Sequence, residues 1–202
     1  MTGLLLFGKA RSVLLGFAAL GLVALVTRLA GNRVFQLRAD ESSQVVPWAV
    51  LTPLLSACAC GLLARSKFAW LERTAARSVV ALRTSYSAVL LLAAAVVTYL
   101  VTTAQTTASA PQGWASAERN LLGLTGFALL GAALIGSAAS WVLPFALAAA
   151  ALTVGGARLL PWGWLIRRDG DAPALGTAAV LVAVGLLAVA FRGTREPRGD
   201  VT

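Results

Sequence analysis

The chain has 202 residues, of which 58% are hydrophobic and only 12% are charged. Soluble domains carry roughly 25% charged residues, so the composition predicts an integral membrane protein. The absence of histidine excludes imidazole-ligated haem, the usual zinc sites and catalysis by a histidine base. The net charge of +9 comes from basic residues at the ends of apolar runs, where membrane proteins carry topology signals, so no nucleic-acid partner is expected.

The N-terminal stretch TGLLLFGKA, residues 2–10, has the glycine and lysine spacing of a phosphate-binding P-loop. The hydroxyl that would hold magnesium is missing, because Ala10 occupies its position. The residues between Gly3 and Gly8 are all large and apolar, which does not suit a loop around phosphates. We therefore expect no nucleotide, metal or other cofactor on this chain, and no catalytic residues.

Six apolar segments follow one another along the chain, and about 20 apolar residues cross a bilayer as a helix. The fourth and fifth form one stretch whose forty residues would make a helix of about 60 Å, twice the hydrocarbon thickness. The chain must therefore fold back, and GSAAS at 136–140 is the predicted turn. The prediction is a single all-α membrane domain over residues 1–202, ending in a polar tail at 192–202. Its six predicted spans are 13–30, 46–64, 84–103, 121–139, 141–160 and 174–191.

The distribution of Lys and Arg predicts the orientation. Segment 65–83 carries five basic residues, whereas AQTTASAPQGWASAE at 104–118 carries none. Because Lys and Arg accumulate in cytoplasmic loops, the first loop is expected in the cytoplasm and the second outside. Six spans then place both termini in the cytoplasm. Arg167 and Arg168 fall outside and run against this rule.

Segment 64–83 is predicted to form a cytoplasmic amphipathic helix between the second and third spans. Arg73 and Arg77 lie one turn apart, opposite the apolar face, and Glu72 lies at the boundary. Basic helices of this kind rest on anionic lipid headgroups or dock on a partner protein, and the spacing alone leaves both open. The apolar face is formed at helical spacing by Phe68, Leu71, Ala75, Val79 and Leu82.

Small residues recur every four positions from the fourth span into the predicted turn. Such a stripe lets helix backbones approach closely, and we expect it to pack helices together. No carboxylate interrupts the centre of any span, which weakens a proton- or ion-driven carrier. Tryptophans near the predicted span ends (Trp114, Trp141, Trp162 and Trp164) are typical of an aromatic belt. The stripe consists of Ala128, Ala132, Gly136 and Ser140.

The order of these features resembles the permease subunits of type-2 ABC exporters, especially the small bacterial forms whose ATPase is a separate chain. FAWLERTAARSVVALR resembles their coupling segment, AERNLLGLTGFALLGAALIG their fourth span, and SWVLPFA the start of their fifth. The resemblance implies a multi-pass permease in the bacterial cytoplasmic membrane, surrounded by lipids. It would work as a homodimer or with a sister permease, and ATP would be hydrolysed by a separate ABC ATPase.

The resemblance also implies roles for particular residues. Arg119 and Asn120 would form a gate or external cap. A simpler explanation is that a helix beginning at the membrane surface needs polar residues there, and that the negative charge of Glu118 complements the dipole at the helix N-terminus. The loop PWGWLIRRDGDAP at 161–173 stands where the family has external helices before the last span. Coupling to the ATPase would involve Phe68, Leu71, Glu72, Arg73 and Arg77.

Two other function classes stay open. An intramembrane lipid-modifying enzyme needs clustered acidic residues, and the pair Asp169 and Asp171 in RRDGDAP is the candidate for that role, although acidic residues in such a turn are more often plain loop. A non-transporting membrane scaffold or immunity protein has no sequence signature of its own.

Overall fold

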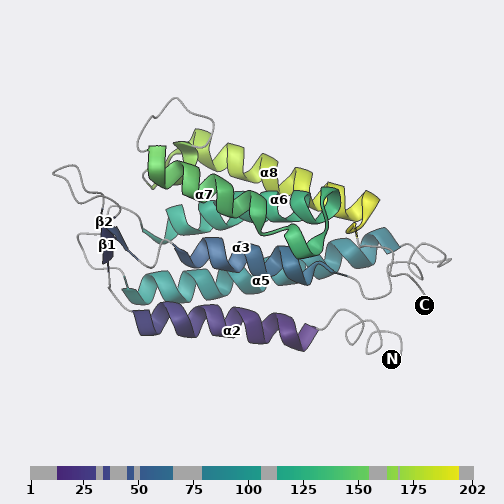
Figure 1. The fold of residues 1–202 in the computed structure, drawn as a ribbon, viewed down its shortest axis with the longest axis horizontal. Coiled ribbons are helices and arrows are strands. Elements are labelled where there is room, and N and C mark those ends of the chain that lie inside the picture. Colours follow the sequence, from purple (N-terminus) through teal and green to yellow (C-terminus); the bar gives the residue numbers. More distant parts are fainter. Residues whose placement is uncertain are drawn as a thin grey trace.

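Helices running back and forth along one axis make up nearly all of the described part of the computed structural model (Figure 1). It describes residues 13–30, 34–36, 45–47, 51–65, 79–105, 113–154, 163–167 and 169–195. Helix α2 begins, and helix α8 ends, at the same end of the bundle (Figure 1). The described α-helices are α2 (Val13–Ala30), α3 (Leu51–Leu63), α5 (Val79–Gln105), α6 (Trp114–Leu134), α7 (Val142–Val154) and α8 (Ala172–Arg192).

Two short strands and two 3-10 turns complete the described elements. Strands β1 (Val34–Gln36) and β2 (Val45–Pro47) pair antiparallel. The turns are η2 (Ser137–Ala139) and η3 (Gly163–Ile166). The predicted all-α class is therefore confirmed for the described residues, apart from this small β-ribbon.

Several helices begin or end some residues away from the limits of the predicted spans. The second segment was expected to be helical from residue 46, but residues 45–47 pair in the ribbon and α3 begins only at Leu51. Two valines favour a strand, and Pro47 disfavours helix in the residue before it. The fourth helix begins at Trp114 rather than at residue 121, and ends at Leu134 rather than at residue 139. Two described helices, Arg83–Ala104 and Ala172–Arg192, are long and apolar enough to cross a bilayer. Three other apolar helices are shorter: Leu15–Leu29, Leu51–Leu63 and Ser137–Ala151.

The predicted turn between the fourth and fifth helices is present. Gly136 has a φ of 115°, a left-handed conformation that glycine adopts without steric cost, and η2 follows directly. The expected stripe is therefore not continuous on one helix. Ala128 and Ala132 are fully buried on α6, whereas Gly136 and Ser140 lie in the turn. Ala128 and Ser140 nevertheless meet α3 together, because a Cβ on Gly61 would lie 2.9 Å from the Ala128 Cβ and 2.7 Å from the Ser140 Oγ.

Helix α6 occupies the middle of the bundle and packs on α3, α5, α7 and most extensively on α8. The crossing with α8 is made by two glycines. A Cβ on Gly185 would lie 2.6 Å from the carbonyl oxygen of Gly126, and a Cβ on Gly126 would collide with the backbone of Leu181. Past the end of α8, Arg195 donates from its backbone N to the carbonyl of Ala132 (3.0 Å) and from Nη1 to that of Leu134 (3.2 Å).

Candidate functional site

The residues implied in ATPase coupling lie outside the described residues. This applies to all five of them: Phe68, Leu71, Glu72, Arg73 and Arg77. What the structure describes is the end of α3 that leads into their segment. There Ala64 is buried in a cluster with Leu129 and Ala132 of α6 and Val189 of α8.

Arg119 and Asn120 lie in the first two turns of α6 and are almost completely buried, at 3% and 4% exposed. Arg119 Nη2 donates to the carbonyl of Arg167 at 2.8 Å, and Asn120 Nδ2 donates to the carbonyl of Leu165 at 2.9 Å. The Arg119 guanidinium also lies 3.4 Å from Asn120 Oδ1. Both side chains thus bind the turn that precedes the last helix. Their role in the structure therefore goes beyond that of a polar helix start, because they hold a turn that is distant in the sequence.

The turn at η3 folds back over α6. Trp164 is 4% exposed and Leu165 is 6% exposed, and both belong to the main apolar core. Gly123 of α6 makes the room, because a Cβ there would collide with the ring of Trp164. Assigning Trp164 to an aromatic belt was therefore wrong. Trp114 and Trp141, by contrast, are about half exposed, at 51% and 45%.

The two aspartates of the same loop each hold the start of a helix. The Asp169 carboxylate accepts hydrogen bonds from the backbone N of Gly113 (3.0 Å) and of Ser116 (2.8 Å), at the start of α6. Asp171 caps α8 by accepting from the backbone N of Ala174 at 2.9 Å. That hydrogen bond, together with an ion pair to Arg167 at 3.3 Å, lowers the pKa of Asp171. These bonds give both carboxylates a structural role, which weakens the lipid-modifying enzyme hypothesis.

Burial lowers the pKa of the Arg119 guanidinium, and the nearby carboxylates of Asp171 and Asp169 oppose that shift. Because an arginine stays charged at any ordinary pH, the site holds a buried cation that the two capping carboxylates compensate at longer range. The sequence carried a signal for one of these caps. Asp171 followed by Ala and Pro fits an N-cap with proline in the first turn.

Glu118 is half-buried at the same end of α6, before residue 121, where the predicted span begins. Its Oε1 is buried and has no hydrogen-bond partner among the described residues. Burial raises the pKa of its carboxyl to about 7. The sequence pattern does not predict this burial, because it indicates only a favourable interaction of Glu118 with the helix N-terminus.

Glu118→Gln is expected to remove a pH dependence of stability. The raised pKa means that the folded protein holds the Glu118 proton more tightly than the unfolded chain does. The free energy of unfolding therefore falls as pH rises from about 4.5 to about 7. Because the group is only half-buried, we expect on the order of 1–2 kcal/mol. Thermal unfolding of the detergent-solubilised protein at pH 5 and at pH 8 measures this change in stability. If stability changes equally between the two pH values in wild type and in Glu118→Gln, Glu118 is not the source of the pH dependence. Asp171, with its lowered pKa, acts in the opposite direction and only at more acidic pH.

Comparison of the chain with protein families, with curated proteins and with solved structures finds no match. The class of fold therefore follows from the structure itself. The described part of the chain is an α-helical bundle in which an apolar turn is held over the central helix by a buried Arg–Asn pair.

Proposed function

We propose that this chain is the membrane-spanning permease subunit of an ABC-type exporter. It would cross the bacterial cytoplasmic membrane six times with both termini in the cytoplasm, and would work as a dimer driven by a separate ATPase. The observation that carries the proposal is the turn at η3, which folds back over α6 directly before the last helix and is bound there by Arg119 and Asn120. The exporter permeases that the sequence resembles carry their external helices at this point of the chain.

The outer surface of the bundle supports a bilayer environment. Large apolar side chains are exposed on every long helix, for example Leu29 (73%) on α2, Leu92 (67%) on α5 and Phe191 (73%) on α8. Soluble monomers rarely expose contiguous apolar patches of more than a few hundred Å². Lipid tails accept such a surface because its side chains are apolar. The helices behind it satisfy their backbone hydrogen bonds internally, as a bilayer requires.

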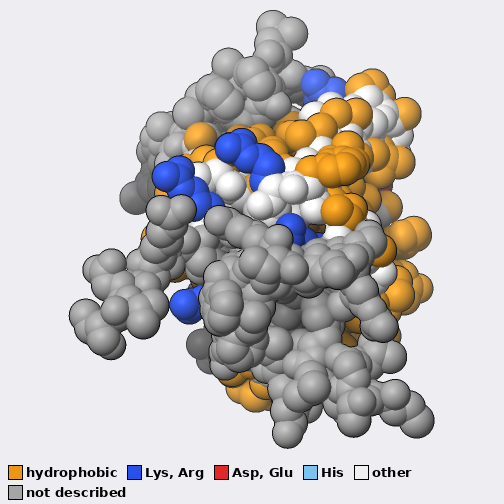
Figure 2. Space-filling view, turned by 90° about the vertical axis from the view of Figure 1, so that its right-hand side faces the viewer, with side chains coloured by type: hydrophobic (Ala, Val, Ile, Leu, Met, Phe, Trp, Pro, Cys, Tyr) orange, Lys and Arg blue, Asp and Glu red, His pale blue; other side chains and the backbone are white. Residues whose placement is uncertain are grey.

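The charges at the two ends of the bundle support the proposed orientation. Figure 2 looks onto the end where α5 begins and α8 ends, and shows arginine side chains there with no acidic side chain among the described residues. The described basic residues at this end are Arg65, Arg83, Arg192 and Arg195. The opposite end holds Arg28, Arg119 and Arg167 together with all three described acidic residues, Glu118, Asp169 and Asp171. The end at which the described residues are basic without acidic neighbours is the one expected in the cytoplasm.

The packing suggests how the coupling segment would act on the bundle. Segment 64–83 continues from Ala64, which packs against α6 and α8, and the preceding Gly61 contacts Ala128 of α6 closely. A push from a closing ATPase would therefore reach α6 within about one turn of the end of α3. The partner can only shift the permease between two states if it binds one of them better, and ATP-driven closure supplies that preference.

The test of this function is Glu72→Ala compared with the double variant Arg73→Ala, Arg77→Ala. An anionic headgroup surface repels a carboxylate and attracts each Lys or Arg by about 1 kcal/mol, so a lipid-resting helix would tolerate the loss of Glu72. In a protein interface, removing one partner of a buried charge pair is costly. We expect Glu72→Ala to lower ATPase co-purification and transport at least about fivefold, which corresponds to about 1 kcal/mol, at unchanged membrane protein level. If Glu72→Ala behaves as wild type while the double arginine variant fails, the helix rests on lipid and the exporter proposal loses this support.

The orientation has its own test. Single cysteines at Ser109 and at Ala75, in a background with Cys58 and Cys60 replaced by Ala, are treated on intact cells with an impermeant thiol reagent. The cysteine at position 109 should react, because its loop is expected outside, and the one at position 75 should react only after the cells are opened. The reverse pattern would place the coupling segment outside the cell and contradict the proposed function.

A further inference from the structure

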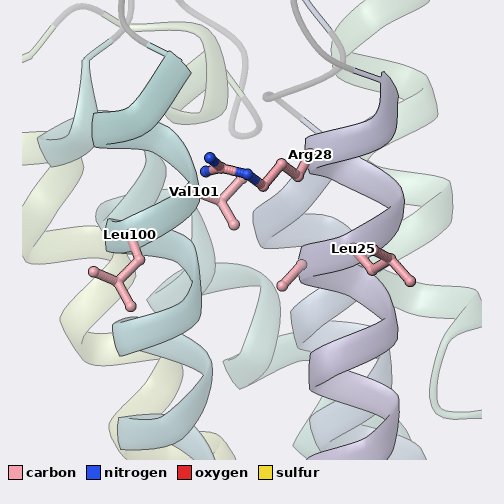
Figure 3. Close-up of a pocket in the computed structure, with 5 residues that line it drawn as sticks. Leu25, Arg28, Leu100 and Val101 are labelled. Carbon is pink, nitrogen blue, oxygen red and sulfur yellow. The ribbon is translucent and has the colours of Figure 1, made fainter.

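A groove of about 330 Å³ runs between α2 and α5. This volume lies in the range of small-molecule pockets, about 300–1,000 Å³. Its wall is apolar except at one end, where Arg28, on the last turn of α2, provides a cation. Figure 3 shows the Arg28 side chain extending from α2 toward α5, close to Val101. The lining residues are Ala24, Leu25, Arg28, Leu100 and Val101.

No acidic side chain in the described part of the chain pairs with Arg28. The three described acidic residues lie elsewhere: Asp169 holds the start of α6, Asp171 caps α8 and pairs with Arg167, and Glu118 is half-buried on α6. A second copy of the chain would offer the same described carboxylates, of which Asp169 and Asp171 are already bonded and Glu118 is half-buried on α6. No described carboxylate therefore complements Arg28, and an exposed apolar wall with one cation at its end fits an amphiphilic anion.

We propose that the groove binds one anionic phospholipid, with its phosphate on the Arg28 guanidinium and an acyl chain along the wall between α2 and α5. The guanidinium binds phosphate oxygens through paired N–H donors, and a chain of methylenes fits a wall whose rim residues, Leu25 and Leu100, are 54% and 59% exposed. Arginines near helix ends commonly extend to the headgroup region. Here the side chain reaches over a groove next to a neighbouring helix (Figure 3), which gives the phosphate and the acyl chain adjacent places to bind.

The lipid site rests on the bilayer part of the proposed function and is independent of the ATPase. Loss of ATPase co-purification in Glu72→Ala would leave lipid binding intact, and failure of lipid binding would leave coupling untouched. The two proposals can therefore fail separately.

The experiment is native mass spectrometry of the full chain in detergent, titrated with phosphatidylglycerol, with phosphatidylcholine of the same acyl chains, and with glycerol 3-phosphate. Wild type should bind phosphatidylglycerol at least about fivefold more tightly than phosphatidylcholine, and glycerol 3-phosphate should not bind in the same range. Arg28→Gln should abolish the preference, and Arg28→Lys should keep part of it, because lysine retains the charge but not the paired donors. Arg192→Gln, an exposed arginine at the opposite end of the bundle, is the matched control and should keep the full preference.

Three outcomes would overturn the proposal. The first is a preference for phosphatidylglycerol that survives in Arg28→Gln or disappears equally in Arg192→Gln. The second is binding of glycerol 3-phosphate as tight as that of the lipid, which would indicate a site for free anions. The third is a lipid-free dimer that Arg28→Gln dissociates, which would make a second copy of the chain the occupant. Circular dichroism establishes that each variant is folded, and the exposed position of Arg28 makes its substitution compatible with the bundle.

Discussion

Arg119→Met is expected to lower the free energy of unfolding by roughly 2–4 kcal/mol. The substitution keeps an apolar stem of similar length but removes the donor to the Arg167 carbonyl and the contact with Asn120 Oδ1. In this buried position water replaces neither bond well, and the turn at η3 loses one of its two polar anchors. Thermal unfolding of the purified protein in detergent measures the loss, and tryptophan fluorescence reports whether Trp164 leaves the core.

Arg167→Gln is the matched control for this experiment. It removes an arginine from the same loop, but one that is about a third exposed and whose ion pair with Asp171 is accessible to solvent. Exposed pairs of this kind contribute about 0–1 kcal/mol. Equal losses in Arg119→Met and Arg167→Gln would show that the turn is not held by its buried anchor, and the gate hypothesis would lose its structural basis.

Gly126→Ala is expected to destabilise the bundle by roughly 1–3 kcal/mol, even though alanine is the better helix former. The added methyl group would collide with the backbone of Leu181, and a backbone cannot rotate away as a side chain can. Helices α6 and α8 would have to move apart. Unfolding in detergent, followed by circular dichroism, measures the effect.

Gly176→Ala on α8 provides the comparison of opposite sign. A Cβ at Gly176 meets no atom within 4 Å, so only the backbone effect remains. The substitution should stabilise the helix by up to about 1 kcal/mol. If Gly126→Ala also stabilised the protein, the close crossing of α6 and α8 would be wrong.

The existence of the helices could be predicted from the apolar segments alone, and α2 and α8 begin and end at or within two residues of the expected limits. The limits of α6 could not be predicted. Its start depends on the Asp169 carboxylate, 53 residues away from Ser116 in the chain, and a local pattern does not contain such a partner. The limits of α3 depend on the pairing of β1 with β2, which is likewise absent from a helical pattern.

The site was predictable in part. Arg119 and Asn120 could be picked out by their position at the start of a span. Their partners could not, because these are backbone carbonyls of the η3 turn, and every residue has a backbone carbonyl. The period-four stripe indicated Ala128 and Ala132 as packing residues. The close crossing of α6 and α8 instead uses Gly126 and Gly185. These two glycines lie on different helices, so no repeat within one segment could indicate that they meet. The five coupling residues lie outside the described part of the chain and remain a prediction.

The tie between Arg195 and the end of α6 restricts which movements the bundle can make. Arg195 fastens the chain after α8 to Ala132 and Leu134. At the other end, Asp169 and Arg119 fasten the loop before α8 to the start of α6, and in between Gly126 and Gly185 interlock the two backbones. Sliding or twisting of α6 against α8 would have to break these hydrogen bonds and separate the two backbones. We therefore expect a change of shape in the described bundle to displace the other helices around an α6–α8 unit that stays together.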